Sequence, residues 1–123
     1  YDVHVRKEAA LCAVAKRYVG FLEQFGAQDQ GNVKELMGSL FASDCQKIVN
    51  GKTITHTVDE LYNQMAKAKE VVGTWSVNIV NPVMVNTETN TVVIHYEILT
   101  QEAGTFVVMK FLTVDNGLVT EIN

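Results

Sequence analysis

With 123 residues, 47% of them hydrophobic and 20% charged, this chain is long enough to bury one core and has the composition of a folded domain, which excludes a disordered chain. A formal net charge of −4, with ten lysines and arginines scattered along the sequence, argues against nucleic acid as a partner. No apolar run approaches the roughly 20 residues that a membrane-spanning helix requires, so we expect no membrane partner either.

The cysteines and the N-terminal residues bear on the cellular compartment. Cys12 and Cys45 lack the spacing of a metal site or a redox motif, and we interpret each as a reduced thiol. The sequence by itself leaves a disulfide between them open. The absence of a signal peptide favours a cytoplasmic location, but the chain starts at Tyr1 without Met, so earlier removal of a leader stays an alternative.

Residues 2–25 have the pattern of a long amphipathic helix, because apolar residues recur at the spacing of one helix face. Charged residues are available for the opposite face, and Gly26 is the predicted end of the helix. The apolar face consists of Leu11, Val14, Tyr18, Phe21, Leu22 and Phe25.

Two further helices are indicated by capping signals. Asn32 followed by Glu35 has the spacing of a capping box, and so has Thr57 followed by Glu60. Gly73 is the predicted end of the helix that Thr57 begins. These signals predict helices over 33–40 and 58–72.

The remaining segments are predicted to be strands. A first strand over 41–49 is turned back by Asn50–Gly51. Strand character returns over 75–85, where Pro82 restricts the later part to an edge or a bulge because proline has no N–H. The last third predicts an antiparallel meander over 91–99, 105–114 and 118–122. Helices on one side of a mostly antiparallel sheet make an α+β domain.

Three short motifs accompany these elements. They are Arg17-Tyr18-Val19 on the first helix, Leu40-Phe41-Ala42-Ser43-Asp44 leading into the first strand, and Asp115-Asn116-Gly117-Leu118-Val119 before the last strand. Together with the order of elements they resemble the NTF2-like superfamily, which includes SnoaL-like polyketide cyclases and ketosteroid isomerases.

This resemblance implies one domain over residues 1–123 with a cystatin-like cone fold. In such a cone, three helices in the N-terminal half pack on a strongly curved, mostly antiparallel sheet and leave a pocket. The resemblance also implies a homodimer formed through the outer face of the sheet. It further implies that the last strand continues beyond Asn123.

Ketosteroid isomerases provide the sharpest test of an enzymatic function. Their site combines a tyrosine on the first helix, an aspartate base near the end of the first strand and an acid on a late strand. Tyr18 matches the tyrosine, whereas the positions of the base and the late acid fall on Val49 and Met109. Because neither Val nor Met can take up a proton, the matching predicts loss of this isomerase chemistry.

The inward face of the closing hairpin depends on its turn. A two-residue turn at Ala103–Gly104 pairs Ile98 with Met109 and Tyr96 with Phe111 on the more apolar face, whereas a three-residue loop would change these pairs. A packed core is the simplest interpretation of such side chains, and the cone resemblance favours a pocket for a small apolar molecule. The predicted ligand-binding residues are Tyr18, Phe21, Trp75, Tyr96, Ile98, Met109 and Phe111.

The ionisable residues are weaker catalytic candidates. With the two-residue turn, His95, Glu97 and Lys110 share the opposite face of the hairpin. They could form an acid–base cluster, but a surface with a Glu97–Lys110 ion pair is the simpler interpretation. Asp44 lies at a helix-to-strand junction and His56 in a loop, where capping or solvation explains them better than catalysis. No histidine spacing or glycine-rich motif indicates a metal or another cofactor, so none is expected.

Three functions agree with this sequence. The first is an NTF2-like domain that binds a small apolar molecule without catalysis. The second is a SnoaL-like or isomerase-like enzyme in which Tyr18 donates to an oxyanion and Asp44, His56 or His95 supplies the acid or base. The third is a homodimeric association module with a closed cone. Its outward interface would comprise Val93, Leu99, Val108 and Leu112.

Overall fold

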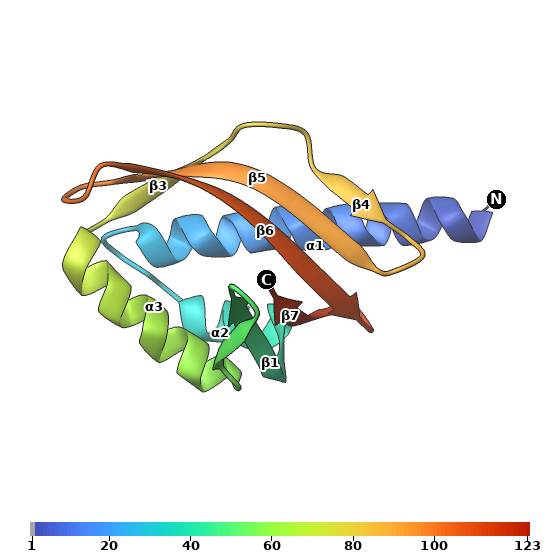
Figure 1. The fold of residues 1–123 in the computed structure, drawn as a ribbon, viewed down its shortest axis with the longest axis horizontal. Coiled ribbons are helices and arrows are strands. Elements are labelled where there is room, and N and C mark those ends of the chain that lie inside the picture. The colour runs from blue at the N-terminus through green and yellow to red at the C-terminus, as the bar shows by residue number, and fades with distance from the viewer. Residues whose placement is uncertain (1) are drawn as a thin grey trace.

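A computed structural model describes residues 2–123 and shows three helices and one seven-stranded mixed sheet (Figure 1). The order of the elements agrees with the sequence predictions. Their bounds are α1 Asp2–Gly26, α2 Val33–Leu40, β1 Phe41–Val49, β2 Lys52–Thr55, α3 Val58–Val72, β3 Trp75–Ile79, β4 Met84–Asn86, β5 Thr91–Thr100, β6 Thr105–Asp115 and β7 Leu118–Ile122.

The sheet has the strand order β2-β1-β7-β6-β5-β3, and β4 also pairs with β5. Strands β1 and β7 are parallel, and all the other pairs are antiparallel. Helix α1 lies along the long strands β5 and β6, whereas α2 and α3 lie with β1 and β2 on the lower side of the view, below α1 (Figure 1). The helices therefore cover the inner face of the sheet and leave the outer face of β5 and β6 open.

Local sequence signals place the turns where they were predicted. Asn50 and Asn116 have φ values of 52° and 50°, and the glycine after each has a φ of 77°, as a tight hairpin turn requires. Pro82 lies between β3 and β4, where the edge of the sheet is interrupted. A proline cannot donate to the ladder, which explains why the predicted strand over 75–85 splits into two short ones.

One of the two predicted N-cap residues caps its helix, although the Glu60 carboxylate accepts from the His56 N–H and not from the Thr57 N–H that a full capping box requires. Thr57 Oγ1 accepts a hydrogen bond from the Glu60 N–H at 3.1 Å and caps α3. The prediction for Asn32 is wrong, because its side chain makes no cap bond to α2. Its Oδ1 accepts instead from Gln24 Nε2 at 2.8 Å, which ties the connection between α1 and α2 to α1.

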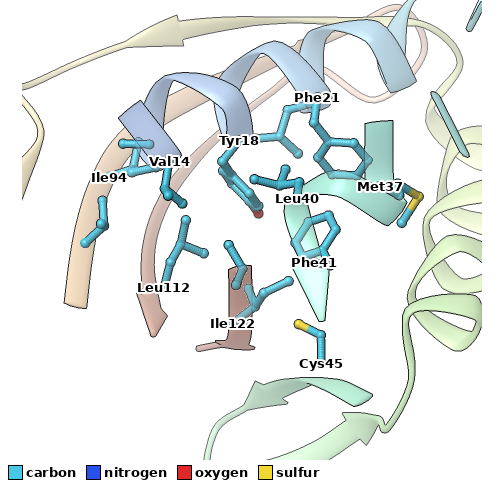
Figure 2. Packing of buried hydrophobic residues seen from close by; sticks show 14 of the residues in the cluster. Val14, Tyr18, Phe21, Met37, Leu40, Phe41, Cys45, Ile94, Leu112 and Ile122 are labelled. Carbon is cyan, nitrogen blue, oxygen red and sulfur yellow. The ribbon is translucent and has the colours of Figure 1, made fainter. Parts of the chain in front are cut away.

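The hydrophobic core lies between α1 and the concave face of the sheet. The whole predicted apolar face of α1 is buried. Phe21 packs edge-on against Phe41, with ring centroids 5.1 Å apart. Figure 2 shows Tyr18 and Phe21 pointing from α1 toward Phe41 and Leu40. Burial of one large apolar side chain contributes about 1.5–3 kcal/mol, so this face fixes α1 on the sheet.

The C-terminal end of α1 depends on the close approach of Trp75. The indole Nε1 donates to the Leu22 carbonyl oxygen at 2.9 Å, and the ring stacks on Phe25 with 5.9 Å between centroids. A Cβ at position 26 would lie 2.4 Å from the indole ring, so the approach requires Gly26. Lys69 Nζ donates to the Phe25 carbonyl oxygen at 2.9 Å and satisfies a free acceptor at the helix end.

The predicted register of the β5–β6 hairpin is wrong. The chain turns through a three-residue loop at 101–103, and Leu99 pairs with Thr105. Relative to the predicted pairing, β6 is shifted by an odd number of residues, which exchanges its inner and outer side chains. Met109 and Phe111 therefore lie on the outer face, 52% and 45% exposed, and not in the cone.

The same shift corrects the predicted outer interface. Val93 and Leu99 of β5 do lie on the outer face. Val108 and Leu112 of β6 turn inward instead, and Leu112 is fully buried in the core. Their places on the outer face are taken by the neighbouring residues of opposite parity, as the period of two along a strand requires.

Replacing Gly26 with alanine will displace the Trp75 ring, because the two would overlap. We expect a loss of about 1–3 kcal/mol in the free energy of unfolding, as for other overpacked sites. The emission of Trp75, the single tryptophan, should shift as well. Denaturant unfolding followed by tryptophan fluorescence measures both effects.

Gly20→Ala is the matched control in the same helix. A Cβ there meets no atom within 4 Å, so this change should raise the stability by about 0.5–1 kcal/mol through backbone entropy. Equal effects of the two substitutions would contradict the role assigned to Gly26.

Candidate ligand-binding site

A cavity of about 220 Å³ lies between α1, α3 and the concave face of the sheet. Most of its wall is aliphatic or aromatic. The apolar lining consists of Phe21, Leu22, Leu61, Met65, Ala68, Val72, Trp75, Ile98, Phe106, Val108 and Ile122. The polar lining consists of Tyr18, Lys47, Gln64, Tyr96, Thr100 and Lys110. The cone is therefore open inside. The third function considered from sequence, an association module, required a closed cone.

Five of the seven side chains predicted to bind a ligand line this cavity. They are Tyr18, Phe21, Trp75, Tyr96 and Ile98. Met109 and Phe111 do not, because the register of β6 places them outside. Phe106 and Val108 line the wall in their place, as the cross-strand partners of Ile98 and Tyr96. That these residues bind a ligand remains a prediction.

Tyr18 of α1 and Tyr96 of β5 meet inside the cone. A side-chain hydrogen bond couples the two phenols. Burial raises the pKa of Tyr96 to about 12, and burial together with the neighbouring Tyr96 raises the pKa of Tyr18 well above its ordinary value. Both hydroxyl groups are therefore neutral at physiological pH, and because the bond between them uses one O–H, the pair keeps one donor for an acceptor in the cavity.

Two lysines share this cavity, Lys47 from β1 and Lys110 from β6. Burial lowers the pKa of Lys47 to about 8, with a smaller contribution from the charge of Lys110. Burial also lowers the pKa of Lys110. Lys47 Nζ donates to Gln64 Oε1 at 3.1 Å. No carboxylate lines the cavity, and within residues 2–123 neither lysine forms a salt bridge.

Sequence reasoning missed both lysines, although the strand patterns contain a signal. Lys47 has the same parity as the buried residues Phe41 and Cys45 of β1. Lys110 has the same parity as the buried Leu112 and Val114 of β6. Because side chains alternate between faces, this parity places both amines inward. The assumed two-residue turn had assigned Lys110 to the opposite face.

The titratable residues proposed from sequence as acid or base do not line the cavity. Asp44 is exposed on β1. His56 is exposed before α3, with its Nδ1 3.8 Å from Glu60 Oε1. His95 lies on the outer face, where its Nδ1 is 2.6 Å from Asn81 Nδ2. The structure therefore places no histidine or carboxylate beside Tyr18 in the cavity.

The predicted cluster of His95, Glu97 and Lys110 is not assembled either. Lys110 faces inward, opposite Ile94, whereas Glu97 faces outward and accepts a hydrogen bond from Asn78 Nδ2 at 2.9 Å. The cross-strand ion pair between Glu97 and Lys110 is therefore wrong. Val49, the position matched to the isomerase base, is exposed at the end of β1 and outside the cavity lining.

Other site types have little support in this part of the chain. Within residues 2–123, no group of three or more His, Cys, Asp or Glu side chains is arranged to hold a metal ion. Cys45 is buried and Cys12 half-buried, and both thiols are free rather than joined in a disulfide. None of the helices within residues 2–123 has the length and apolar character needed to cross a membrane.

Comparison with known proteins identifies the fold. No protein-family model matches this chain, and neither does any curated protein. Solved structures do match. A candidate SnoaL-like polyketide cyclase from Jannaschia sp. CCS1 is 16% identical, with 93% of this chain and 83% of the other covered, at a TM-score of 0.74. The chain has the NTF2-like cone fold.

Two more structures support the same assignment of the NTF2-like cone. An NTF2-like protein of unknown function from Exiguobacterium sp. 255-15 is 12% identical over 89% of this chain and 93% of its own, with a TM-score of 0.70. A candidate isomerase of the SnoaL-like family from Agrobacterium tumefaciens is 10% identical over 93% and 94%, also at 0.70. At these identities the similarity establishes the fold and not an activity.

Replacing Lys47 with methionine is expected to stabilise the folded chain near neutral pH. The pKa of Lys47 is about 8 in the folded chain, against an ordinary value of 10.5. Below pH 8 the amine is charged in both states, and only the folded state carries the cost of the buried charge. Between about pH 8 and 10.5 the folded chain loses this proton first, so that cost disappears. Thermal unfolding across this pH range measures the difference.

The gain in melting temperature should be largest below pH 8 and should shrink toward pH 10.5. Lys67→Met is the control, since Lys67 is an exposed lysine on α3. A gain for Lys47→Met that does not change with pH would show that packing, and not the charge, causes it.

Proposed function

We propose that this chain binds a small, mainly apolar molecule in the cavity between α1, α3 and the sheet. The observation that carries the proposal is a space of about 220 Å³ with apolar walls and a few polar groups. This combination is typical of ligand sites, where apolar surface supplies affinity and a few polar groups fix the orientation. For scale, an apolar protein cavity of about 150 Å³ holds benzene.

The position of Trp75 makes the site accessible to measurement. Trp75 is the single tryptophan, and its ring lines the cavity. Its Nε1 is held by the Leu22 carbonyl oxygen and its ring stacks on Phe25, so the indole is a fixed wall. A bound molecule would touch this wall and change the tryptophan emission.

A second candidate function is a SnoaL-like or isomerase-like enzyme. The observation that favours it is Lys47, whose pKa of about 8 leaves part of its population neutral near physiological pH. A neutral amine can act as a general base, and the Tyr18 hydroxyl in the same cavity can donate to a developing oxyanion. In this form of the proposal Lys47 replaces the acid or base expected at Asp44, His56 or His95.

We also propose a homodimer formed through the outer face of β5 and β6. Apolar side chains on this face remain exposed, among them Leu99, Val107, Met109 and Phe111. An exposed apolar patch on a sheet is typical of a protein interface. A two-fold contact between copies would bury the same patch on both subunits.

Val108→Phe will abolish binding in the cavity, because the larger side chain fills the space next to Tyr96. We expect a titration with 3-phenylpropan-1-ol to change the Trp75 emission in the unmodified chain and not in this variant. Val107→Phe is the matched control, since Val107 is the adjacent residue on the outer face and is 65% exposed. Equal binding by both variants would place the ligand outside the cavity.

Met109→Glu should convert the proposed dimer into monomers, because it places a charge within the exposed apolar face. Analytical ultracentrifugation of the unmodified chain and the variant measures the change. Val71→Glu is the control, because Val71 is an exposed apolar residue on α3, away from the sheet face. If the unmodified chain sediments as a monomer at high concentration, the proposed homodimer is wrong.

A further inference from the structure

The positive charge inside the cavity is not balanced by the protein. Lys47 and Lys110 reach it from β1 and β6, and no carboxylate accompanies them in the lining. The other polar groups there are the two phenols, the Gln64 amide and the Thr100 hydroxyl, which carry no negative charge at physiological pH.

This arrangement is costly for the folded chain. A half-buried ammonium without an anionic partner loses part of its hydration, and two neighbouring ammonium groups repel one another. The lowered pKa of Lys47, caused by burial and by Lys110, reports both effects. An apolar side chain at either position would avoid this cost. Residues that cost stability in a cavity are typical of a functional site.

Hydrogen-bond donors in the cavity remain available. An ammonium group has three N–H donors, and within residues 2–123 the only side-chain hydrogen bond of either lysine is that from Lys47 Nζ to Gln64 Oε1 at 3.1 Å. A bound anion would neutralise part of the charge and accept from these donors. The Tyr18 and Tyr96 hydroxyls, which hydrogen-bond to one another, add one more donor that stays protonated.

The size and character of the remaining wall limit the anion. The volume of about 220 Å³ exceeds that of a cavity for benzene, so it has room for a molecule of roughly 8–12 non-hydrogen atoms. Apolar and aromatic side chains such as Phe21, Trp75 and Ile98 dominate the wall. The ligand therefore needs an apolar body of one ring or a short chain.

The charged group of the ligand is best matched by a carboxylate. The cavity lining contains two lysines but no arginine, and no glycine-rich loop contributes to it. Phosphate sites typically combine arginine forks, backbone N–H groups or a helix N-terminus. Two amines and two phenols are sufficient for a single carboxylate.

We infer that the cavity binds a small apolar monocarboxylic acid, with its carboxylate between Lys47 and Lys110 and its apolar body against the aromatic wall. The inference rests on the proposed binding function and names the chemical class of the ligand. It also explains why two lysines without acidic partners lie in an otherwise apolar space.

Matched probes test the inference on the unmodified chain. The first pair is 3-phenylpropanoate and 3-phenylpropanamide, which differ in charge and hardly in shape. The second pair is octanoate and octanamide, which distinguishes an aromatic from an aliphatic body. Calorimetry and Trp75 fluorescence at pH 7 measure each affinity. We expect at least one carboxylate to bind about tenfold more tightly than its amide, as for a partly buried charge-assisted contact.

Two variants locate the contact. Lys47→Met and Lys110→Met should each weaken carboxylate binding about tenfold and leave amide binding within about threefold. Lys67→Met, at an exposed lysine outside the cavity, should change neither. Carboxylate binding should also weaken as the pH rises above about 8, because Lys47 loses its proton while the facing groups Tyr18 and Tyr96 stay neutral.

The possible results separate the two proposals. Equal affinity for acid and amide, unchanged by the lysine variants, overturns the carboxylate inference and supports the binding function. Binding of no probe of either charge overturns the binding function and, with it, the inference. A carboxylate preference that persists in both lysine variants overturns the assigned contact.

Discussion

The register of β5 and β6 is the constraint on which the cavity depends. Thr100 holds it: its backbone N–H donates to the Gly104 carbonyl oxygen at 2.9 Å, and its Oγ1 accepts from the Ala103 N–H at 2.9 Å. Gly104 has a φ of 78°, which closes the loop without steric cost. The loop thereby determines which side chains of β6 face α1. Because side chains alternate along a strand, a shift of β6 by one residue would turn Lys110 out of the cavity and turn its neighbours Met109 and Phe111 inward.

A second constraint is the close packing of α1 against the start of β3. The Trp75 ring fits over Gly26 and stacks on Phe25, and Lys69 of α3 donates to the same end of α1. These contacts fix the positions of α1, α3 and the sheet edge relative to one another. A cavity persists between them because its walls are large, rigid side chains anchored elsewhere, which cannot collapse into the space.

The electrostatics of the cavity follow from the side chains that reach it. The NTF2-like cone supplies a space, and the chemistry of that space depends on the side chains that reach it. Val49 and Met109, which the sequence resemblance matched to the isomerase carboxylates, both lie outside the lining, so that matching does not describe this cavity. The titratable groups inside are two amines and two phenols. A site of this composition favours recognition of negative charge over carboxylate-based proton transfer.

The sequence by itself determined the elements and most of their ends, because the signals are local. Capping by Thr57, the turns at Asn50 and Asn116 and the break at Pro82 each depend on residues a few positions apart. The apolar face of α1 also follows from spacing alone, and with it the inward position of Tyr18.

Only the tertiary structure decided the hairpin register, and therefore the site. The sequence allows either a two- or a three-residue loop before Thr105, since both tolerate Gly104. The choice follows from contacts with a distant segment: the Gln101 N–H donates to the Thr74 carbonyl oxygen at 2.8 Å, and the Glu102 N–H to that of Val72 at 2.9 Å. These bonds join the loop to the end of α3, across nearly thirty residues of chain. Local propensity cannot encode such a contact. For this reason the sequence placed Lys110 in a surface ion pair, whereas the structure places it in the cavity.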